Sequence, residues 1–335
     1  MSLSLNPTAL FRLQGGKNLL AFSAGVDSSA LFFLLLEAGI PFDMAMVDYG
    51  IREQSKAEVA YAKELAEKHG KTLHLKAVTA DTKNFEANAR TIRYDFFAEL
   101  CRLNGYETVI TAHQLNDRTE WFLMQFAKGA GAVELFGMDY LSESDGYTLV
   151  RPMLDISRDE IESYLKTHGI RHFEDTSNQD TTYSRNAFRH AFGNPLVHDY
   201  ASGIRKTFAL LREDADTLLP PTPYSQVEEM VLIKRSAIHA DIRQVDRHLK
   251  RMGYLLSAAQ KTEILRQQEC VIGGKIVVVL GEEIIAIAPY TDTVMPKETK
   301  EAFRLAGIPA KIRPYLFSRG ITVDRFEEGV KTILN

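Results

Sequence analysis

The first half of the chain alternates short apolar runs with longer amphipathic stretches. The apolar runs have the length and composition of buried strands at 19–22, 44–47, 73–78 and 109–112. The stretches between them carry apolar residues at helical spacing and predict helices at 28–38, 54–69, 85–103 and 116–128. Strands that alternate with helices form βαβ units, so we expect an α/β fold with an N-terminal parallel sheet and helices on both faces. Such a sheet binds its ligand at the carboxyl ends of its strands.

Two features follow this region. Ser157-Arg158-Asp159-Glu160 is a capping box, and it predicts a helix over 157–168 that Gly169 ends. The next segment, 174–186, is rich in Asp, Asn, Ser and Thr and is long for a connector, which favours either a functional loop or a disordered one.

The C-terminal part has a different pattern. A long helix is expected over 196–219, and Pro220-Pro221 ends it. A basic helix at 238–252 and a β-hairpin over 275–288 are expected beyond that linker. We therefore expect an α/β domain over 1–195, a helix and linker over 196–222, and a small α+β domain over 223–335.

Composition excludes several protein classes. The 335 residues are 45% hydrophobic and 25% charged, which is typical of a folded globular chain rather than a disordered one. No apolar run reaches the roughly 18 residues of a membrane span, and we see no signal-peptide pattern. Cys101 and Cys270 form no CxxC pair, so neither a disulfide framework nor a thiolate zinc site is expected. A cytoplasmic protein without a membrane partner, either a monomer or a homodimer, is the expectation.

The segment 21–29, Ala-Phe-Ser-Ala-Gly-Val-Asp-Ser-Ser, is the most informative in the chain. An apolar strand runs into a small polar loop, and a helix begins at once, so helix N–H groups and serine hydroxyls can bind a phosphate. Neither GxxxxGK[ST] nor GxGxxG occurs in the chain. Asp27 in an anion site is explained if a metal ion lies between its carboxylate and the phosphates. A turn whose serines only cap the helix is the alternative.

Ordered motifs point to a family. Residues 23–28 resemble the SGGxDS loop of the N-type ATP pyrophosphatases, which cut ATP between its α and β phosphates and transfer AMP. Further segments resemble, in the same order, motifs of the tRNA(Ile)-lysidine synthases, and the resemblance covers about residues 17–190. These segments are 47–52 (like VNHGLR), 87–94 (like ENxARxxRY), 112–120 (like HHxxDxxET), 151–154, and 175–180 with 185–186.

The resemblance implies ATP as a substrate, bound in a PP-loop domain. The residues that it assigns to the nucleotide are Ser23, Ala24, Gly25, Val26, Asp27, Ser28, Ser29, Val47 and Gly129. Gly129 lies in a Lys-Gly-Ala-Gly segment where the family often has RGSG. By its spacing alone, this glycine is explained as the end of the preceding helix.

His113, Asp117 and Glu120 follow the strand at 109–112. Asp117 and Glu120 lie one turn apart on an expected helix and could hold Mg²⁺. The alternative is an acidic first turn that complements the helix dipole. With the resemblance, the implied metal ligands are Asp27, Asp117 and Glu120, and His113 is a candidate base for deprotonating lysine.

Several arginines are candidates for binding anions. Arg90 and Arg93 share one helix face, and the resemblance favours a catalytic role for Arg90. The candidate substrate-binding residues are Arg185, Asn186, Arg189, Arg243 and Arg247. The last two belong to a basic stripe on the helix at 238–252, which either contacts RNA phosphates or is a solvated face.

The resemblance implies a two-step ligation on an isoleucine tRNA with a CAU anticodon. ATP first adenylates the wobble cytidine at its 2-carbonyl, and free lysine then displaces AMP to give lysidine. Ala24, Asp48, Tyr49 and Asn116 depart from the family pattern, and Ala24 costs about 1 kcal/mol or more if its φ is positive. A tRNA thiolation enzyme, a small-molecule amide ligase and a non-catalytic ATP sensor remain alternatives.

Overall fold

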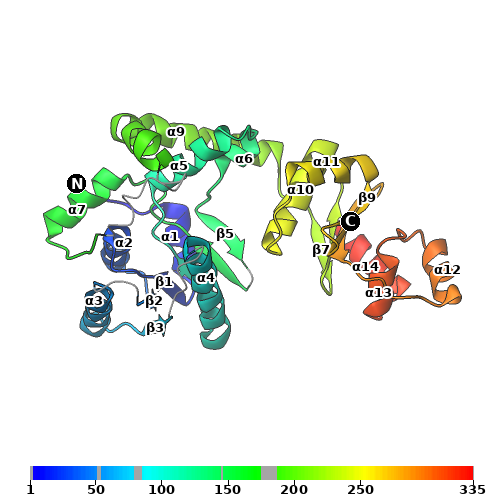
Figure 1. Cartoon of the computed structure of the whole chain (residues 1–335), viewed down its shortest axis with the longest axis horizontal. Coiled ribbons are helices and arrows are strands. Elements are labelled where there is room, and N and C mark those ends of the chain that lie inside the picture. The colour runs from blue at the N-terminus through cyan, green and yellow to red at the C-terminus, as the bar shows by residue number, and fades with distance from the viewer. Residues whose placement is uncertain (1–2, 51–53, 79–84, 145, 175–186, 335) are drawn as a thin grey trace. The chain divides into compact units, whose positions relative to one another are not determined.

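The computed structural model describes residues 3–50, 54–78, 85–144, 146–174 and 187–334. The chain forms two compact units, Met1–Asp214 and Ala215–Asn335 (Figure 1). The boundary between them falls inside a long helix, α9 (Asn194–Leu218), before the Pro220-Pro221 linker. Tyr200 has non-helical torsion angles (φ −129°, ψ 23°), so α9 is kinked rather than continuous as expected. No helix in the described ranges combines the length and apolar character needed to cross a membrane.

The first unit is built on a six-stranded sheet with the order β3-β2-β1-β4-β6-β5. Five strands run parallel, and β5 is antiparallel at one edge. The strand order changes direction between β1 and β4, which makes this pair the switch point where such sheets bind ligands. The strands are β1 (Asn18–Ala21), β2 (Asp43–Asp48), β3 (Leu73–Ala77), β4 (Thr108–Ile110), β5 (Leu141–Ser144) and β6 (Tyr147–Val150).

Side chains of neighbouring residues enter different cores, as alternation along a strand requires. Leu19 and Val109 pack in one cluster with Phe97 of α4. Leu20 and Ile110 pack in another with the apolar residues of α2. Helices therefore cover both faces of the sheet, which confirms the predicted fold class. The helices of this unit are α1 (Pro7–Leu13), α2 (Val26–Glu37), α3 (Ser55–Lys68), α4 (Phe85–Asn104), α5 (Leu115–Phe126), α6 (Ala132–Phe136), α7 (Arg158–His168) and the π-helical turn η2 (Arg189–Gly193).

The start of α7 follows the predicted capping box. The Ser157 backbone N–H donates to Glu160 Oε2 at 2.7 Å, and the Glu160 N–H donates to Ser157 Oγ at 3.3 Å. Gly169 ends the helix in the left-handed conformation with a φ of 62°. Local sequence therefore fixes where α7 begins and ends, and it places Arg158 at the first helical position.

The second unit is a five-stranded antiparallel sheet with the order β7-β8-β11-β10-β9. The predicted hairpin is present as β10 (Ile276–Leu280) and β11 (Ile284–Pro289), with Leu280 paired to Ile285. One core contains side chains of α10 and α11, and a second contains those of α12, α13 and α14. The remaining elements are β7 (Tyr224–Val227), β8 (Met230–Lys234), β9 (Glu269–Ile272), α10 (Ile238–Arg251), α11 (Ala258–Gln267), α12 (Lys297–Leu305), α13 (Arg313–Ser318) and α14 (Val323–Leu334).

Candidate active site

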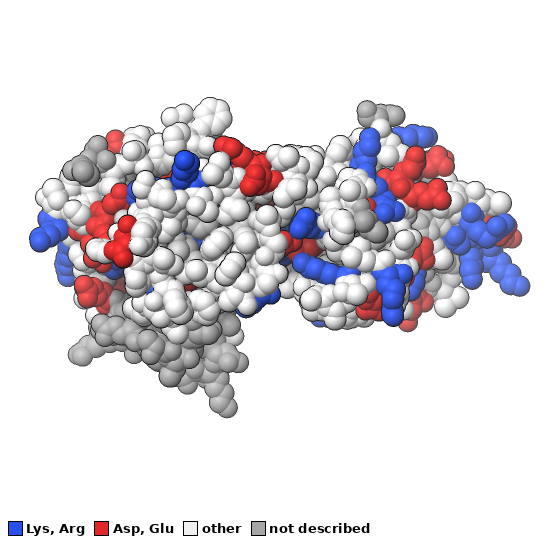
Figure 2. Space-filling view, turned by 90° about the horizontal axis from the view of Figure 1, so that it is seen from above, with Lys and Arg blue, Asp and Glu red and all other residues white. Residues whose placement is uncertain are grey.

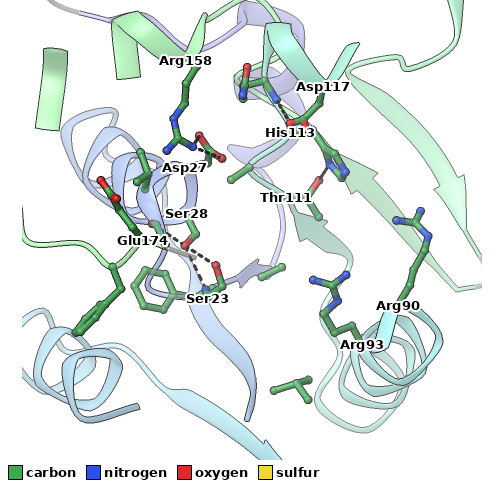
Figure 3. Close-up of a pocket in the computed structure, with 18 of the residues that line it drawn as sticks. Ser23, Asp27, Ser28, Arg90, Arg93, Thr111, His113, Asp117, Arg158 and Glu174 are labelled. Atoms are coloured by element: carbon green, nitrogen blue, oxygen red, sulfur yellow. Dashed lines mark hydrogen bonds and ion pairs between the residues drawn. The ribbon is translucent and has the colours of Figure 1, made fainter. Parts of the chain in front are cut away.

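A cavity of about 640 Å³ lies in the first unit, beyond the carboxyl ends of β1, β2 and β4 (Figure 3). The loop after β1 forms one wall, and α4 forms the opposite wall with Arg90 and Arg93. The position is the one that the strand order predicts for a ligand. Charged and polar groups in its lining include Ser23, Asp27, Ser28, Tyr49, Arg90, Arg93, Thr111, His113, Asp117, Arg158, Glu162, Glu174, Arg189 and His190.

The loop after β1 is held by its own serines. Ser23 Oγ and Ser28 Oγ lie 3.1 Å apart, the Ser23 N–H donates to Ser28 Oγ at 3.2 Å, and Ser28 Oγ donates to the Gly25 carbonyl at 3.2 Å. Gly25 precedes the first residue of α2, and no side chain caps the helix there. The amides of the first turn of α2 therefore face the cavity without a side-chain acceptor, which favours an anion as their partner.

Ala24 adopts a φ of 59°, so its departure from the glycine of the family motif falls at a left-handed position. Its side chain is fully buried in the core of the first unit. Its carbonyl accepts a hydrogen bond of 2.9 Å from the Phe173 N–H. The loop therefore keeps the strained conformation with alanine, because packing and this backbone contact hold it in place.

Asp27 lies in the first turn of α2 and pairs with Arg158 of α7. Arg158 Nη1 lies 3.1 Å from both carboxylate oxygens of Asp27, and Arg158 Nε lies 2.6 Å from Glu162 Oε1. Burial raises the pKa of Asp27 from its usual 3.8 to about 6, against the opposing effect of Arg158, and nearby Asp117 raises the pKa further.

Asp117 and Glu120 of α5 both contact Arg189, the first residue of η2. Arg189 Nη2 lies 2.9 Å from Asp117 Oδ1, and Arg189 Nε lies 2.8 Å from Glu120 Oε2. The other Asp117 oxygen accepts the Gln114 N–H at 3.1 Å, so it also caps α5. Glu120 is almost fully buried and does not line the cavity. The structure thus brings together three of the predicted residues, two acids and one arginine.

The expected metal set does not form one cluster. Asp27 is paired with Arg158, whereas Asp117 and Glu120 are paired with Arg189. Within the described residues no group of three or more acidic, histidine or cysteine side chains is placed to hold a metal ion. Mg²⁺ in nucleotide sites usually takes one or two carboxylates together with phosphate oxygens. Asp27 and Asp117 line the cavity and fit that arrangement, whereas Glu120 does not line it, so the metal role of the three acids stays a prediction.

His113 and the α4 arginines complete the lining. His113 Nδ1 lies 2.8 Å from Thr111 Oγ1, directly after β4. The Arg90 guanidinium lies 4.5 Å from the ring centre of Tyr94, one turn further along α4. This cation–π contact orients the guanidinium. Val47 also lines the cavity from the end of β2.

Other predicted residues lie elsewhere. Gly129 follows the C-terminus of α5 with a φ of 77°, as a helix-ending glycine does, and does not line the cavity. Ser29 is buried in α2, and its Oγ has no hydrogen-bond partner in the part of the chain that the structure describes. Arg243 and Arg247 lie on α10 in the second unit. Arg185, Asn186 and most of the polar segment fall outside the described residues, as does Arg52.

Sequence reasoning assigned no role at the site to Arg158 or Glu162, although both line the cavity. The capping box already placed Arg158 in the first turn of a helix. A cation there is unfavourable for the helix dipole, because the N-terminus carries partial positive charge. That conflict with local preference was the available signal that Arg158 has a partner or a function elsewhere.

Known proteins are similar to this chain in sequence. The family model of the PP-loop domain matches residues 5–196. The tRNA(Ile)-lysidine synthase of Campylobacter jejuni is 41% identical over 312 residues, covering 93% of this chain and 95% of that protein. The enzyme of the same name from Helicobacter pylori is 39% identical over 314 residues, covering 93% and 92%.

Among solved structures, the U34-tRNA thiolase NcsA from Methanococcus maripaludis superposes with a TM-score of 0.51 and 17% identity, covering 62% of this chain and 75% of that one. At this identity the superposition supports the fold and nothing finer. The sequence matches to the lysidine synthases extend through both units and nearly the full length of the relatives. The chain therefore belongs to the tRNA(Ile)-lysidine synthase family.

Proposed function

We propose that this chain ligates free lysine to the wobble cytidine of a CAU-anticodon isoleucine tRNA, with ATP converted to AMP and pyrophosphate. The observation that carries the proposal is the uncapped N-terminus of α2, which opens into the cavity at the sheet's switch point beside Asp27. ATP phosphates can act as acceptors for these amides, which no side chain caps. The relatives named above are the second support.

The first step requires charge neutralisation on the triphosphate. The amides of α2 and the hydroxyls of Ser23 and Ser28 would bind phosphate oxygens, and Asp27 would hold Mg²⁺ against them. Mg²⁺ supplies Lewis-acid neutralisation of the leaving pyrophosphate. The cytidine O2 then attacks the α-phosphorus, and Arg90 on the opposite wall would neutralise phosphate charge.

The second step requires a bound, deprotonated lysine. Asp117 and Glu120 were expected as metal ligands, but their pairing with Arg189 favours a different role. Asp117 and Arg189 both line the cavity, and a carboxylate beside a guanidinium is complementary to the ammonium and carboxylate groups of a free amino acid. The buried Glu120 would orient Arg189 from behind. His113 lies in the same cavity and is the candidate that takes the proton from the attacking amine.

The two roles of the acid pair make different predictions. If Asp117 binds lysine, Asp117→Asn raises the KM for lysine about tenfold and leaves the Mg²⁺ concentration for half-maximal rate nearly unchanged. If Asp117 binds Mg²⁺, the same substitution raises the Mg²⁺ concentration for half-maximal rate and leaves the KM for lysine nearly unchanged. Steady-state rates at varied lysine and varied Mg²⁺ separate the roles.

The second unit is proposed to contact the tRNA through α10. Figure 2 shows lysine and arginine side chains spread over the surface of this unit. Part of the predicted stripe is already neutralised, because Lys250 lies 2.8 Å from the buried Asp246. Arg243 and Arg247 keep their candidate role. Arg247→Glu should weaken tRNA binding and lower its salt dependence, whereas ATP binding should not change.

The cysteines argue against a thiolation reaction. Cys101 and Cys270 are both buried and belong to different units. Burial raises the pKa of the Cys101 thiol to about 11, so little reactive thiolate forms at neutral pH. Thiolation chemistry that uses a pair of neighbouring cysteines would find no such pair in Cys101 and Cys270.

The decisive assay uses pure protein, ATP, Mg²⁺, labelled lysine and a CAU-anticodon isoleucine tRNA transcript. A transcript with uridine at the wobble position is the control. The proposal expects label in the first tRNA alone, with equal amounts of AMP and pyrophosphate. Formation of ADP, or nucleotide binding without turnover, would refute the ligase mechanism and favour the ATP sensor.

A further inference from the structure

Arg158 occupies a position at the phosphate loop that no motif assigns to it. It is the first residue of α7, and its side chain is 32% exposed at the cavity wall. Figure 3 shows its guanidinium directed from α7 toward the start of α2, where it meets Asp27. The residue is thus reachable from the cavity and adjacent to the uncapped amides of α2.

The contacts of Arg158 fix the plane of its guanidinium. Nε is held at 2.6 Å by Glu162, one turn along the same helix. Nη1 is shared at 3.1 Å between both Asp27 oxygens. These contacts hold Nε and Nη1, which lie on different sides of the guanidinium, and they orient the Nη2 donors for an oxyanion group.

The pair with Asp27 is explained by what both groups face. Asp27 lies in the first turn of α2, where the helix dipole favours a negative charge. Arg158 lies in the first turn of α7, where the dipole disfavours its positive charge. Arg158 therefore gains from an anion near α2, and the Asp27 carboxylate supplies one.

We propose that Arg158 binds the β- and γ-phosphates of ATP and stabilises pyrophosphate as it leaves. This inference rests on the proposed function, since it assigns a residue to the adenylation step. In that step the cytidine O2 forms a bond to the α-phosphorus. The bond from the α-phosphorus to the bridging oxygen breaks, and the electron pair leaves with pyrophosphate. Arg158 donates to oxygens whose charge increases, and Asp27, no longer paired with Arg158, would be available to hold Mg²⁺.

An arginine that binds only the β- and γ-phosphates affects one end of the nucleotide and not the other. Arg158 should matter for ligands that carry the β- and γ-phosphates and not for AMP. It should also matter for the adenylation step and not for lysine binding, which the acid pair of α5 is proposed to serve. A general loss of positive charge in the cavity would instead weaken the binding of every anion to a similar extent.

The binding test uses the full chain with inorganic pyrophosphate, ATP and AMP as probes in calorimetric titrations with Mg²⁺. Arg158→Gln should weaken pyrophosphate and ATP at least about tenfold and AMP less than about twofold. Arg158→Lys keeps the positive charge but loses the planar set of donors. Its affinity for pyrophosphate and ATP should therefore fall between those of the wild type and of Arg158→Gln. Arg102→Gln removes the same charge from the exposed end of α4, outside the cavity, and is the matched control that should leave all three affinities unchanged.

Three results would overturn the assignment. Equal weakening of AMP and pyrophosphate by Arg158→Gln would mean a general electrostatic or folding effect. Unchanged pyrophosphate affinity would mean that Arg158 only pairs with Asp27. Wild-type protein that binds AMP but not pyrophosphate would remove the subsite itself. Thermal melts of both Arg158 variants exclude unfolding as the cause.

Kinetics distinguish this inference from the function on which it rests. In the lysidine assay, Arg158→Gln should raise the KM for ATP or lower the adenylation rate, with the KM for lysine unchanged. If wild-type protein forms no lysidine, the proposed function fails, whatever the binding data show. If wild-type protein is active and Arg158→Gln has the same ATP parameters, this inference alone fails.

Discussion

Replacing Asp27 with asparagine should make the first unit more stable while it abolishes adenylation. The pKa of Asp27 is raised from 3.8 to about 6, so folding favours its protonated form. The raised pKa means that the ionised carboxylate destabilises the folded state at neutral pH. At about 1.4 kcal/mol per pKa unit the upper limit is about 3 kcal/mol. Because the side chain is 30% exposed and the variant loses the ion pair with Arg158, we expect the free energy of unfolding of Asp27→Asn to exceed that of the wild type by about 1–2 kcal/mol.

The sign of the effect gives a pH signature. Below a pH of 3.8 the carboxyl is mostly protonated in the folded and unfolded states, so the wild type and the Asp27→Asn variant should have nearly the same free energy of unfolding. As pH rises from that value through 6, the wild type loses stability relative to Asp27→Asn. The difference should be complete by about pH 8.

Urea unfolding at pH 4, 6 and 8 measures this difference. The chain has one tryptophan, Trp121, in α5 of the first unit, so its fluorescence follows that unit. Asp95→Asn changes one exposed acid on α4 and should show no such pH-dependent gain. An Asp27→Asn variant that is less stable than wild type at pH 8, or a difference independent of pH, would refute the reasoning.

Three further predictions concern stability. Ala24→Gly relieves the left-handed φ but loses a buried methyl group and adds unfolded-state freedom, so urea unfolding should change by less than about 1 kcal/mol and lysidine formation should persist. Arg118 is 1% exposed, 4.2 Å from the ring centre of Phe208 and 3.6 Å from Asp155. Arg118→Ala should therefore cost about 3 kcal/mol and Arg118→Met clearly less, and equal losses would contradict a packing role. Burial lowers the pKa of His248 from 6.5 to about 4, so the second unit should lose up to about 3 kcal/mol as pH falls from 6.5 to 4. Hydrogen exchange in that unit should show the loss in wild type and not in His248→Gln.

Local patterns predicted the architecture well. The alternation of strands and helices, the capping box at Ser157 and the hairpin at 276–289 each depend on residues close in sequence, and the structure confirms them. The antiparallel edge strand β5 and the kink at Tyr200 were not predicted, because tertiary packing rather than local pattern determines them.

The site was predicted in part. The loop at 23–28 and the position of Asp117 after β4 follow from strand order and motif spacing, and both line the cavity. The pairing of Asp27 with Arg158 and of Glu120 with Arg189 joins residues that are 131 and 69 positions apart. Contacts between residues so far apart in the sequence cannot be predicted from periodicity or motif spacing. Gly129 is the opposite case. Its φ of 77° is explained by its local role in ending a helix, with no contact from elsewhere in the chain needed.

The hydrogen bond from the Phe173 N–H to the Ala24 carbonyl has a consequence for communication within the domain. In a trans peptide the Ala24 carbonyl and the Gly25 N–H point in opposite directions from one planar unit. An anion that accepts the Gly25 N–H would polarise that unit and strengthen the bond on its other side. Nucleotide occupancy would then tighten the backbone at Phe173, directly before the polar segment at 174–186, without any movement of a side chain.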